Sequence, residues 1–248
     1  MFAFQQLTPT RYDLRFSMAG IPARVHPSFW LIAILFGASG DLLLLPIWVL
    51  VVFVSILIHE LGHALAFRRY GQRSEIVLYF GGGLTIPEPV YWGSGVANVS
   101  LTANQQIFIS LAGPGAGFLF AGLVLAIVLV IGGYVIPIWL GFIPLPLNAV
   151  VPFGGIVVTA LIRMLLWVNI FWGLINLAPV YPLDGGNVAR NVLIQVDSVD
   201  GVRKSLWLSV IAGGIVALLG WVFFESLFIT FLFALLAFQS YQALQHRF

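Results

Sequence analysis

Long runs of apolar residues alternate with short polar stretches along the chain. A helix that crosses a bilayer needs about 20 mostly apolar residues, because each residue adds about 1.5 Å to its length. Six runs meet or approach this requirement, at residues 27–45, 47–70, 106–131, 155–177, 206–220 and 221–241. The fifth run is short, and the turn before the sixth is tight. The pattern predicts an all-α polytopic membrane protein with about six transmembrane helices.

Two stretches between these runs follow a different pattern. Within residues 71–105, the segment 75–80 is rich in strand-forming residues, and three glycines at 81–83 separate it from 84–86. This predicts a small strand-like, membrane-associated segment after the second span, with a peripheral interfacial loop as the alternative. Its exposed edge could pair with an extended peptide. Residues 132–154 are apolar but rich in Pro and Gly, which suggests an interfacial segment, with a further short span as the alternative.

The composition excludes a soluble protein. Of the 248 residues, 60% are hydrophobic and 8% are charged, whereas soluble domains carry about 25% charged residues. The pI of about 9.2 rests on 11 thinly spread basic residues, which indicates membrane topology rather than nucleic-acid binding. Because the chain has no cysteine, thiolate is excluded as a metal ligand.

The basic residues also predict the orientation of the chain. All but one of the 11 fall on the same side of a six-span arrangement. These residues are Arg11, Arg15, Arg24, Arg68, Arg69, Arg73, Arg190, Arg203, Lys204 and Arg247. By the positive-inside rule, both termini of this cell-membrane protein are expected in the cytoplasm. The remaining cation, Arg163, lies inside the fourth run, where snorkelling towards the outer surface is favoured over a functional role.

The domain organisation follows from the same map. Residues 1–24 are expected to form a cytoplasmic N-terminal segment, because they have neither the apolar core nor the cleavage site of a signal peptide. Residues 25–248 are expected to form a single transmembrane domain, with its core at 47–190 and the strand-like loop at 71–105.

The pentapeptide His59-Glu60-Leu61-Gly62-His63 lies inside the second apolar run. Residues four apart share one face of a helix, so His59 and His63 can offer two imidazoles to one metal ion. Glu60 lies beside them, where its carboxylate can accept a proton from a water molecule that the metal activates. This H-E-x-x-H pattern is typical of zinc hydrolases. Ionisable groups inside a transmembrane helix are costly, and they therefore indicate a functional site.

A catalytic zinc site usually has three protein ligands, so this helix supplies one ligand too few. His59 lies about 16 Å from the cytoplasmic end of its helix, which disfavours Asp41 and Glu225 on the opposite side. The remaining candidates are acidic residues and histidines of the cytoplasmic side, namely Asp13, Glu75, Glu88, Asp184, Asp197, Asp200, His26 and His246.

Asp184 is favoured because of the segment around it. Pro179 and Pro182 end the fourth run and force an extended path, along which an apolar segment can turn back into the helix bundle. Gly185 and Gly186 allow a close approach of the backbone. The alternative is that Asp184 only caps a helix that runs from about 187 to 196. The incomplete two-histidine site on the same membrane side favours Asp184 as a ligand.

This combination of motifs resembles the site-2 protease family of intramembrane zinc metalloproteases. The resemblance rests on His59-Glu60-x-x-His63 and, two spans later, on Asn176-x-x-Pro179-x-x-x-x-Asp184-Gly185. Weaker similarities lie at residues 25–29, 80–82 and 112–114.

Two positions depart from the family pattern. Gly117 stands where the family often has Asn, and Asn187 stands where Arg is common. Neither is a proposed ligand, so the departures bear on substrate choice more than on chemistry. No appended PDZ or CBS domain is expected, and the chain looks like a minimal six-span member.

The resemblance implies one Zn²⁺ ion per chain, held by His59, His63 and Asp184, with Glu60 as the general base. Asn176 is expected to hydrogen bond the substrate backbone or the oxyanion. The implied activity is that of an intramembrane zinc metalloendopeptidase. The expected substrate is a transmembrane protein, cut in or near its spanning segment so that a cytoplasmic regulatory fragment is released. The lipid bilayer is the expected surrounding, and no nucleic-acid partner is expected.

Three other functions compete with this prediction. A non-catalytic membrane scaffold could keep a zinc ion, but it would not need Glu60. A metal transporter would place polar ligands along several spans, and most spans offer few. A different class of membrane peptidase would use a glutamate as third ligand, but Glu75, Glu88 and Glu225 lack a comparable context.

Overall fold

The structure is a computed structural model, which describes residues 8–37, 40–88, 90–92, 95–97, 100–140, 143–223 and 225–247. The chain forms two compact units, and each is described by itself. The N-terminal unit contains Phe2–Val99 and Ala112–Leu174, and the C-terminal unit contains Ser100–Leu111 and Ile175–Phe248. Helix α3 (Ala103–Val130) contributes to both.

Five helices within the described residues are long and apolar enough to cross a membrane. They are α2 (Leu45–Arg69), α3, the continuous helix formed by α4 (Gly155–Trp167), η2 (Val168–Trp172) and α5 (Gly173–Asn176), and then α7 (Gly201–Val222) and α8 (Leu227–Arg247). Large apolar side chains such as Leu119 and Val130 lie exposed on these helices, as lipid-facing surfaces require. The prediction of a mostly helical, multi-pass membrane protein is therefore confirmed, although the count of six spans is not.

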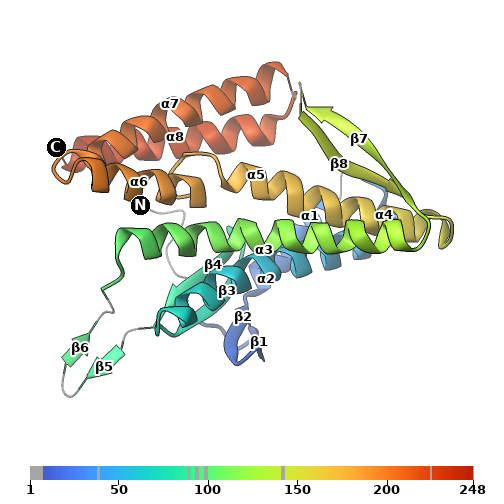
Figure 1. Ribbon diagram of the computed structural model, residues 1–248, viewed down its shortest axis with the longest axis horizontal. Helices are drawn as coiled ribbons and strands as arrows, with labels where there is room; N and C mark the ends of the chain where they lie inside the picture. The colour runs from blue at the N-terminus through green and yellow to red at the C-terminus, as the bar shows by residue number, and fades with distance from the viewer. Residues whose placement is uncertain are drawn as a thin grey trace. The chain divides into compact units, whose positions relative to one another are not determined.

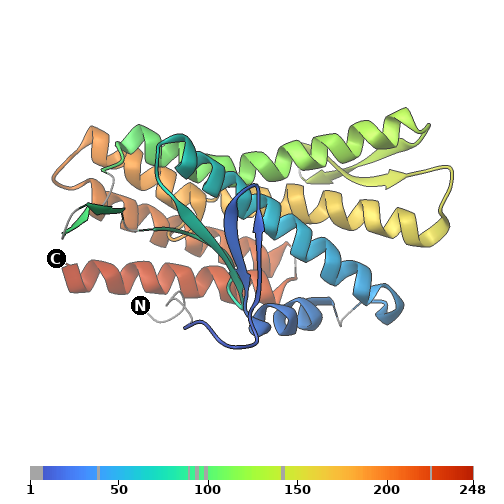
Figure 2. The ribbon, with the colours of Figure 1, turned by 90° about the horizontal axis from the view of Figure 1, so that it is seen from below.

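A four-stranded sheet packs beside α2 in the N-terminal unit (Figure 2). Its strands are β1 (Leu14–Met18), β2 (Ile21–Val25), β3 (Ser74–Tyr79) and β4 (Gly82–Pro87), which lie side by side in this order. The β3–β4 hairpin confirms the strand-like segment predicted after the second span, and Gly82 adopts the positive φ of 109° that its turn requires. The parallel pairing of β2 with β3 was not predicted. A small hairpin of β5 (Val90–Trp92) and β6 (Gly95–Ala97) follows.

The run at 27–45, predicted as the first span, does not form one membrane-crossing helix. Helix α1 (Pro27–Gly37) has 11 residues, which corresponds to about 16 Å, or about half of the bilayer core. The short helix η1 (Leu42–Leu44) follows, and the carboxylate of Asp41 caps it.

The short length of α1 follows from the place where it begins. The backbone N–H of His26 donates to the carbonyl of Leu78 at 2.8 Å. Leu78 pairs with Gly83, which lies against Glu60 in the middle part of α2. Helix α1 therefore starts part-way along α2, and strand β2 carries the preceding part of the chain.

Residues 132–154 contain a β-hairpin, so the alternative of a further short helical span is wrong. Strands β7 (Tyr134–Leu140) and β8 (Ile143–Val150) join α3 to α4 (Figure 1). The segment is rich in β-branched and aromatic residues, which favour strands. Leu145, Leu147 and Ala149 pack in an apolar core with α3 and α4. Arg163 contacts the same hairpin, since its Nε donates to the Ala149 carbonyl at 3.4 Å.

The C-terminal unit is built around α7 and α8, which run side by side (Figure 1). Helix α7 has 22 residues and begins at Gly201, earlier than the predicted run. The amphipathic helix α6 (Asp184–Val196) precedes it. Val180, in the segment between α5 and α6, is fully buried against Ala217, Phe233 and Leu236. The proline-containing segment is therefore fixed on this helix pair.

Candidate metal centre

His59, Glu60 and His63 lie together on α2, as predicted. His59 Nε2 and His63 Nε2 are 3.2 Å apart. One potential ligand atom from each of the three residues lies within 4.8 Å of the others. Glu60 and His63 are buried, and His59 is half-buried. The helix thus presents two imidazole nitrogens and a carboxylate at one largely buried point.

The spacing of the two imidazole nitrogens fits a zinc ion. Nitrogen ligands at about 2.0–2.1 Å from a tetrahedral zinc ion are about 3.3 Å from each other. The observed 3.2 Å between His59 Nε2 and His63 Nε2 agrees with this value. The two histidines can therefore act as two ligands of one ion without moving far.

Strand β4 holds the carboxylate of Glu60. The hydroxyl of Thr85 donates to Glu60 Oε2 at 2.7 Å and lies 3.0 Å from the Glu60 carbonyl oxygen. Gly83 lies against the same side chain, because a Cβ at this position would be 2.4 Å from Glu60 Oε1. The carboxylate is therefore oriented by a hydroxyl at one oxygen and enclosed by backbone at the other.

Helix α3 packs directly against the histidine-bearing part of α2. A Cβ at Gly62 would be 2.3 Å from the Ala112 carbonyl oxygen. A Cβ at Gly113 would be 2.2 Å from His63 Nε2. Small residues let membrane helices approach closely, and here they leave just enough space for the imidazole of His63.

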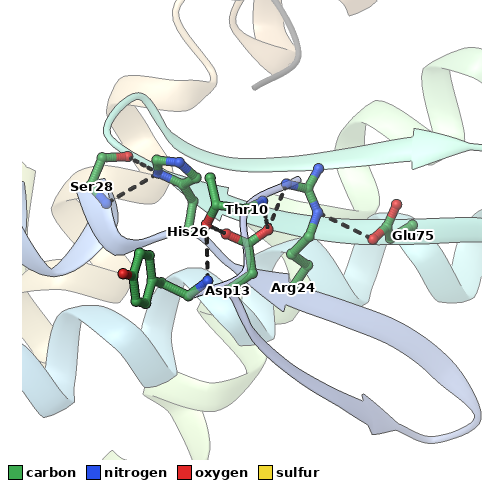
Figure 3. A network of polar contacts seen from close by, with 7 residues as sticks. Thr10, Asp13, Arg24, His26, Ser28 and Glu75 are labelled. Carbon is green, nitrogen blue, oxygen red and sulfur yellow. Dashed lines mark hydrogen bonds and ion pairs between the residues drawn. The ribbon is translucent and has the colours of Figure 1, made fainter. Parts of the chain in front are cut away.

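A network of polar contacts links β2 and β3 of the sheet that carries Thr85 to the segment before β1 (Figure 3). Arg24 on β2 pairs with Asp13 Oδ2 at 3.2 Å and with Glu75 Oε1 at 3.4 Å. Burial acts to raise the pKa of Asp13, but hydrogen bonds from Thr10 and Arg24 outweigh it and lower that pKa. Two of the candidate third ligands, Asp13 and Glu75, are thus engaged by Arg24.

Other candidate ligands also have partners elsewhere. His26 Nδ1 accepts the backbone N–H of Ser28 at 3.1 Å, and the Ser28 hydroxyl oxygen accepts the N–H of Phe80 (Figure 3 shows the His26–Ser28 contact). This joins two of the weaker sequence similarities, 25–29 and 80–82, in one contact. Asp197 pairs with Lys204 at 2.6 Å. The backbone N–H of Asp200 and the Lys204 ammonium lower the pKa of Asp197 to about 2.

Asp184 is the first residue of α6 and lies in the C-terminal unit. Helix α6 begins at Asp184 rather than near 187, and Leu183 stands at its N-cap position. Gly185 allows the first turn of α6 to approach the backbone after α5, because a Cβ there would be 2.1 Å from the Leu177 carbonyl oxygen. Asn176 is the last residue of α5 and is half-buried. The roles of Asp184 as third ligand and of Asn176 as substrate contact stay predictions.

Sequence reasoning missed Thr85, Ser55 and Asn169. Thr85 gave no signal, because its contact with Glu60 depends on how the hairpin folds onto α2. Ser55 and Asn169 form a buried hydrogen bond between α2 and η2. Both are polar residues in apolar runs, which was the available signal.

The model of peptidase family M50 matches residues 47–220. This range covers more than half of the chain and contains both halves of the predicted site. The chain belongs to peptidase family M50. The predicted resemblance to the site-2 proteases is thereby confirmed for this M50 chain.

Individual M50 relatives agree with this membership. The chain is 26% identical over 232 residues to a zinc metalloprotease of Methanocaldococcus jannaschii, across 89% of this chain and 59% of the relative. It is 32% identical over 195 residues to a Synechocystis relative whose name describes a zinc metalloprotease, across 73% of this chain and 44% of that relative. The chain thus spans about half the length of these curated relatives.

A solved structure shows the same fold. The site-2 protease from Methanocaldococcus jannaschii matches this M50 chain with a TM-score of 0.56 and 21% sequence identity. The match covers 94% of this chain and 95% of that structure. The arrangement of helices and strands is therefore of the site-2 protease type.

Proposed function

We propose that this M50 chain is a zinc metalloendopeptidase that hydrolyses peptide bonds in or near the transmembrane segments of membrane-anchored proteins and releases a cytoplasmic fragment. The observation that carries the proposal is the buried Glu60 carboxylate beside two imidazole nitrogens that are 3.2 Å apart. A structural metal site needs ligands but no adjacent carboxylate of this kind. Membership of a family whose named relatives are zinc metalloproteases supports the same activity.

His59, His63 and Asp184 are the proposed ligands of one zinc ion. Bound zinc would supply a Lewis acid that makes a water molecule more acidic and polarises the scissile carbonyl. Glu60 is the proposed base that takes up the proton of the attacking water, and the Thr85 hydroxyl orients its carboxylate through Oε2. Glu60 then passes the proton to the leaving amine. Asn176 is proposed to donate to the substrate backbone or to the oxyanion.

Strand β4 is the proposed binding place of the unwound substrate. A helical substrate hides its carbonyls in its own hydrogen bonds, so it must become extended before cleavage. Strand β3 is paired on both sides, by β2 and by β4, whereas β4 is the last strand of the described sheet next to α2. A substrate strand added at β4 would lie beside Glu60, since Gly83 and Thr85 both contact that residue.

The proposal is tested by comparing membrane-protein fragments in cells that carry the wild-type chain or Glu60→Gln. Glutamine keeps the size of the side chain but cannot act as the base. We expect fragments that appear only with the wild type, and these would identify the substrate. Identical fragment profiles under all inducing conditions would contradict the proposal and would favour the non-catalytic scaffold.

A further inference from the structure

A buried polar contact lies close to the histidines but takes no part in the proposed chemistry. Asn169 donates one amide N–H to Ser55 Oγ at 2.9 Å and the other to the Leu165 carbonyl at 2.8 Å. Asn169 is 4% exposed and Ser55 is 3% exposed. Both amide protons are therefore used inside an apolar helix bundle, where a satisfied polar pair fixes how helices pack.

Ser55 lies on the histidine-bearing face of α2. Ser55, His59 and His63 follow each other at intervals of four residues, which places them along one side of the helix. Asn169 therefore holds this face one turn before the first histidine.

A second contact holds α2 beyond His59. The backbone at Gly62 lies directly against the Ala112 carbonyl of α3. The contacts at Ser55 and Gly62 are about 10 Å apart along the helix, and His59 lies between them. A rotation of α2 about its own axis would break at least one of them.

The π-helical segment η2 places Asn169 in this position. A π-helical turn contains more residues than an α-helical turn and thereby shifts the side chains that it carries, often at functional sites. Gly117 on α3 lies beside Asn169, because a Cβ there would be in van der Waals contact with the Asn169 carbonyl oxygen at 3.5 Å and with Asn169 Oδ1 at 3.6 Å. Asn169 thus lies in a space that α2 and α3 both border.

We propose that Asn169 is a positioning residue for the metal centre. Through Ser55 it sets the rotation of α2, and thereby the direction in which His59 and His63 present their Nε2 atoms. This inference rests on the proposed zinc site and concerns the geometry of its two histidines.

The test measures metal binding by the purified full chain in detergent, after removal of metal with a chelator. The variants are Ser55→Ala, Asn169→Ala and the double variant. Each single change is expected to weaken zinc binding about tenfold, in the range seen when residues that orient metal ligands are removed. The double variant should bind no more weakly than either single variant, because both changes remove the same hydrogen bond.

Cobalt(II) gives a second readout that a change in stability alone would not move. The chain has no cysteine, so its cobalt absorption spectrum reports nitrogen and oxygen ligands only. We expect the same altered band in both single variants. The matched control is Ser240→Ala, which removes a buried hydroxyl that has no hydrogen-bond partner within the described residues. It should leave zinc affinity and the cobalt spectrum unchanged.

Wild-type zinc affinity and cobalt spectra in both Ser55→Ala and Asn169→Ala would overturn the inference, even if thermal stability fell. If Asn169→Ala does not fold, the zinc affinity and cobalt spectrum of Ser55→Ala, the smaller change, are sufficient to test the inference. Failure of the wild-type chain to bind zinc would instead overturn the proposed function and this inference with it.

Discussion

The two carboxylate oxygens of Glu60 have different surroundings. Oε2 accepts the Thr85 hydroxyl at 2.7 Å, whereas Oε1 lies against the backbone at Gly83. A carboxylate that is fixed through one oxygen keeps the other in a defined direction for proton transfer. Thr85 therefore acts on the proposed general base without being a proposed metal ligand.

Replacing Thr85 by valine tests this role. Thr85→Val keeps the shape of the side chain but removes the hydroxyl, so kcat should fall about tenfold while zinc content stays that of the wild type. Cleavage of an identified substrate and metal analysis of the same preparation measure both quantities. The control is Thr159→Val, a half-buried position in α4. An unchanged kcat in Thr85→Val would show that Glu60 needs no such support.

The space beside His63 is tested by a second pair of variants. In Gly113→Ala the new methyl group would meet His63 Nε2 at 2.2 Å, so the imidazole must move and zinc binding should be lost or strongly weakened. Gly115→Ala lies on the same helix and meets nothing within 4 Å, so it should bind zinc as the wild type does. Zinc titration of both purified variants measures their affinities. Equal affinities in Gly113→Ala and Gly115→Ala would contradict the described packing.

At the scale of elements, most of the long apolar runs predicted from the sequence correspond to long helices in the structure. Helices α2 and α3 and the continuous helix of α4, η2 and α5 lie within a few residues of the predicted runs, whereas α7 starts earlier than its run. The single first span predicted at 27–45 was not found, and the hairpin of β7 and β8 within 132–154 was not predicted as strands. The run at 27–45 forms the short helix α1 and then η1, and the apolar segment 132–154 forms two strands. Hydropathy measures neither helix length nor strand pairing, and it cannot distinguish a strand packed against protein from a helix facing lipid.

The role of β4 can be tested by cross-linking, because the chain has no cysteine of its own. In a Glu60→Gln background, Leu84→Cys on β4 should form a disulfide with a single cysteine placed near the cleavage site of the substrate. Strand addition at the sheet edge brings the two side chains close together. Leu50→Cys, a 55% exposed position on α2, is the control and should not cross-link. Equal cross-linking at both positions would argue against substrate binding at β4.

At the scale of the whole molecule, the proposed orientation makes opposite ends of α2 accessible from opposite sides. The β1–β2 turn lies at the C-terminal end of α2, where Arg68 donates to the Ala19 carbonyl of that turn. Single cysteines at Ser17 and Leu43, both exposed, report the two ends. An impermeant maleimide should label Leu43→Cys in intact cells and Ser17→Cys only after permeabilisation. The reverse pattern would place the termini outside the cytoplasm.

The candidate metal site has two halves, the histidine pair and the segment around Asp184, and the sequence alone predicted them to different extents. The four-residue spacing of His59 and His63 is a local property of a helix, so the sequence was sufficient. Asp184 was favoured from its proline and glycine context, and the close backbone approach expected at the glycines is present at Gly185, whereas the role of Asp184 as a ligand stays a prediction. Contacts that depend on the packing of distant segments, such as Thr85 on Glu60, have no local signature and required the structure.

The central claim is that Asp184 completes one zinc site with His59 and His63. The most direct measurement is the zinc stoichiometry and affinity of the purified Asp184→Asn protein, compared with the wild type and with Asp200→Asn. Asp200 precedes α7 and makes no side-chain cap hydrogen bond, so it is a matched acidic control on the segment that follows α6. We predict one zinc ion per chain in the wild type and in Asp200→Asn, and loss of tight binding in Asp184→Asn. One tightly bound zinc ion in Asp184→Asn, with the affinity of the wild type, would contradict the account.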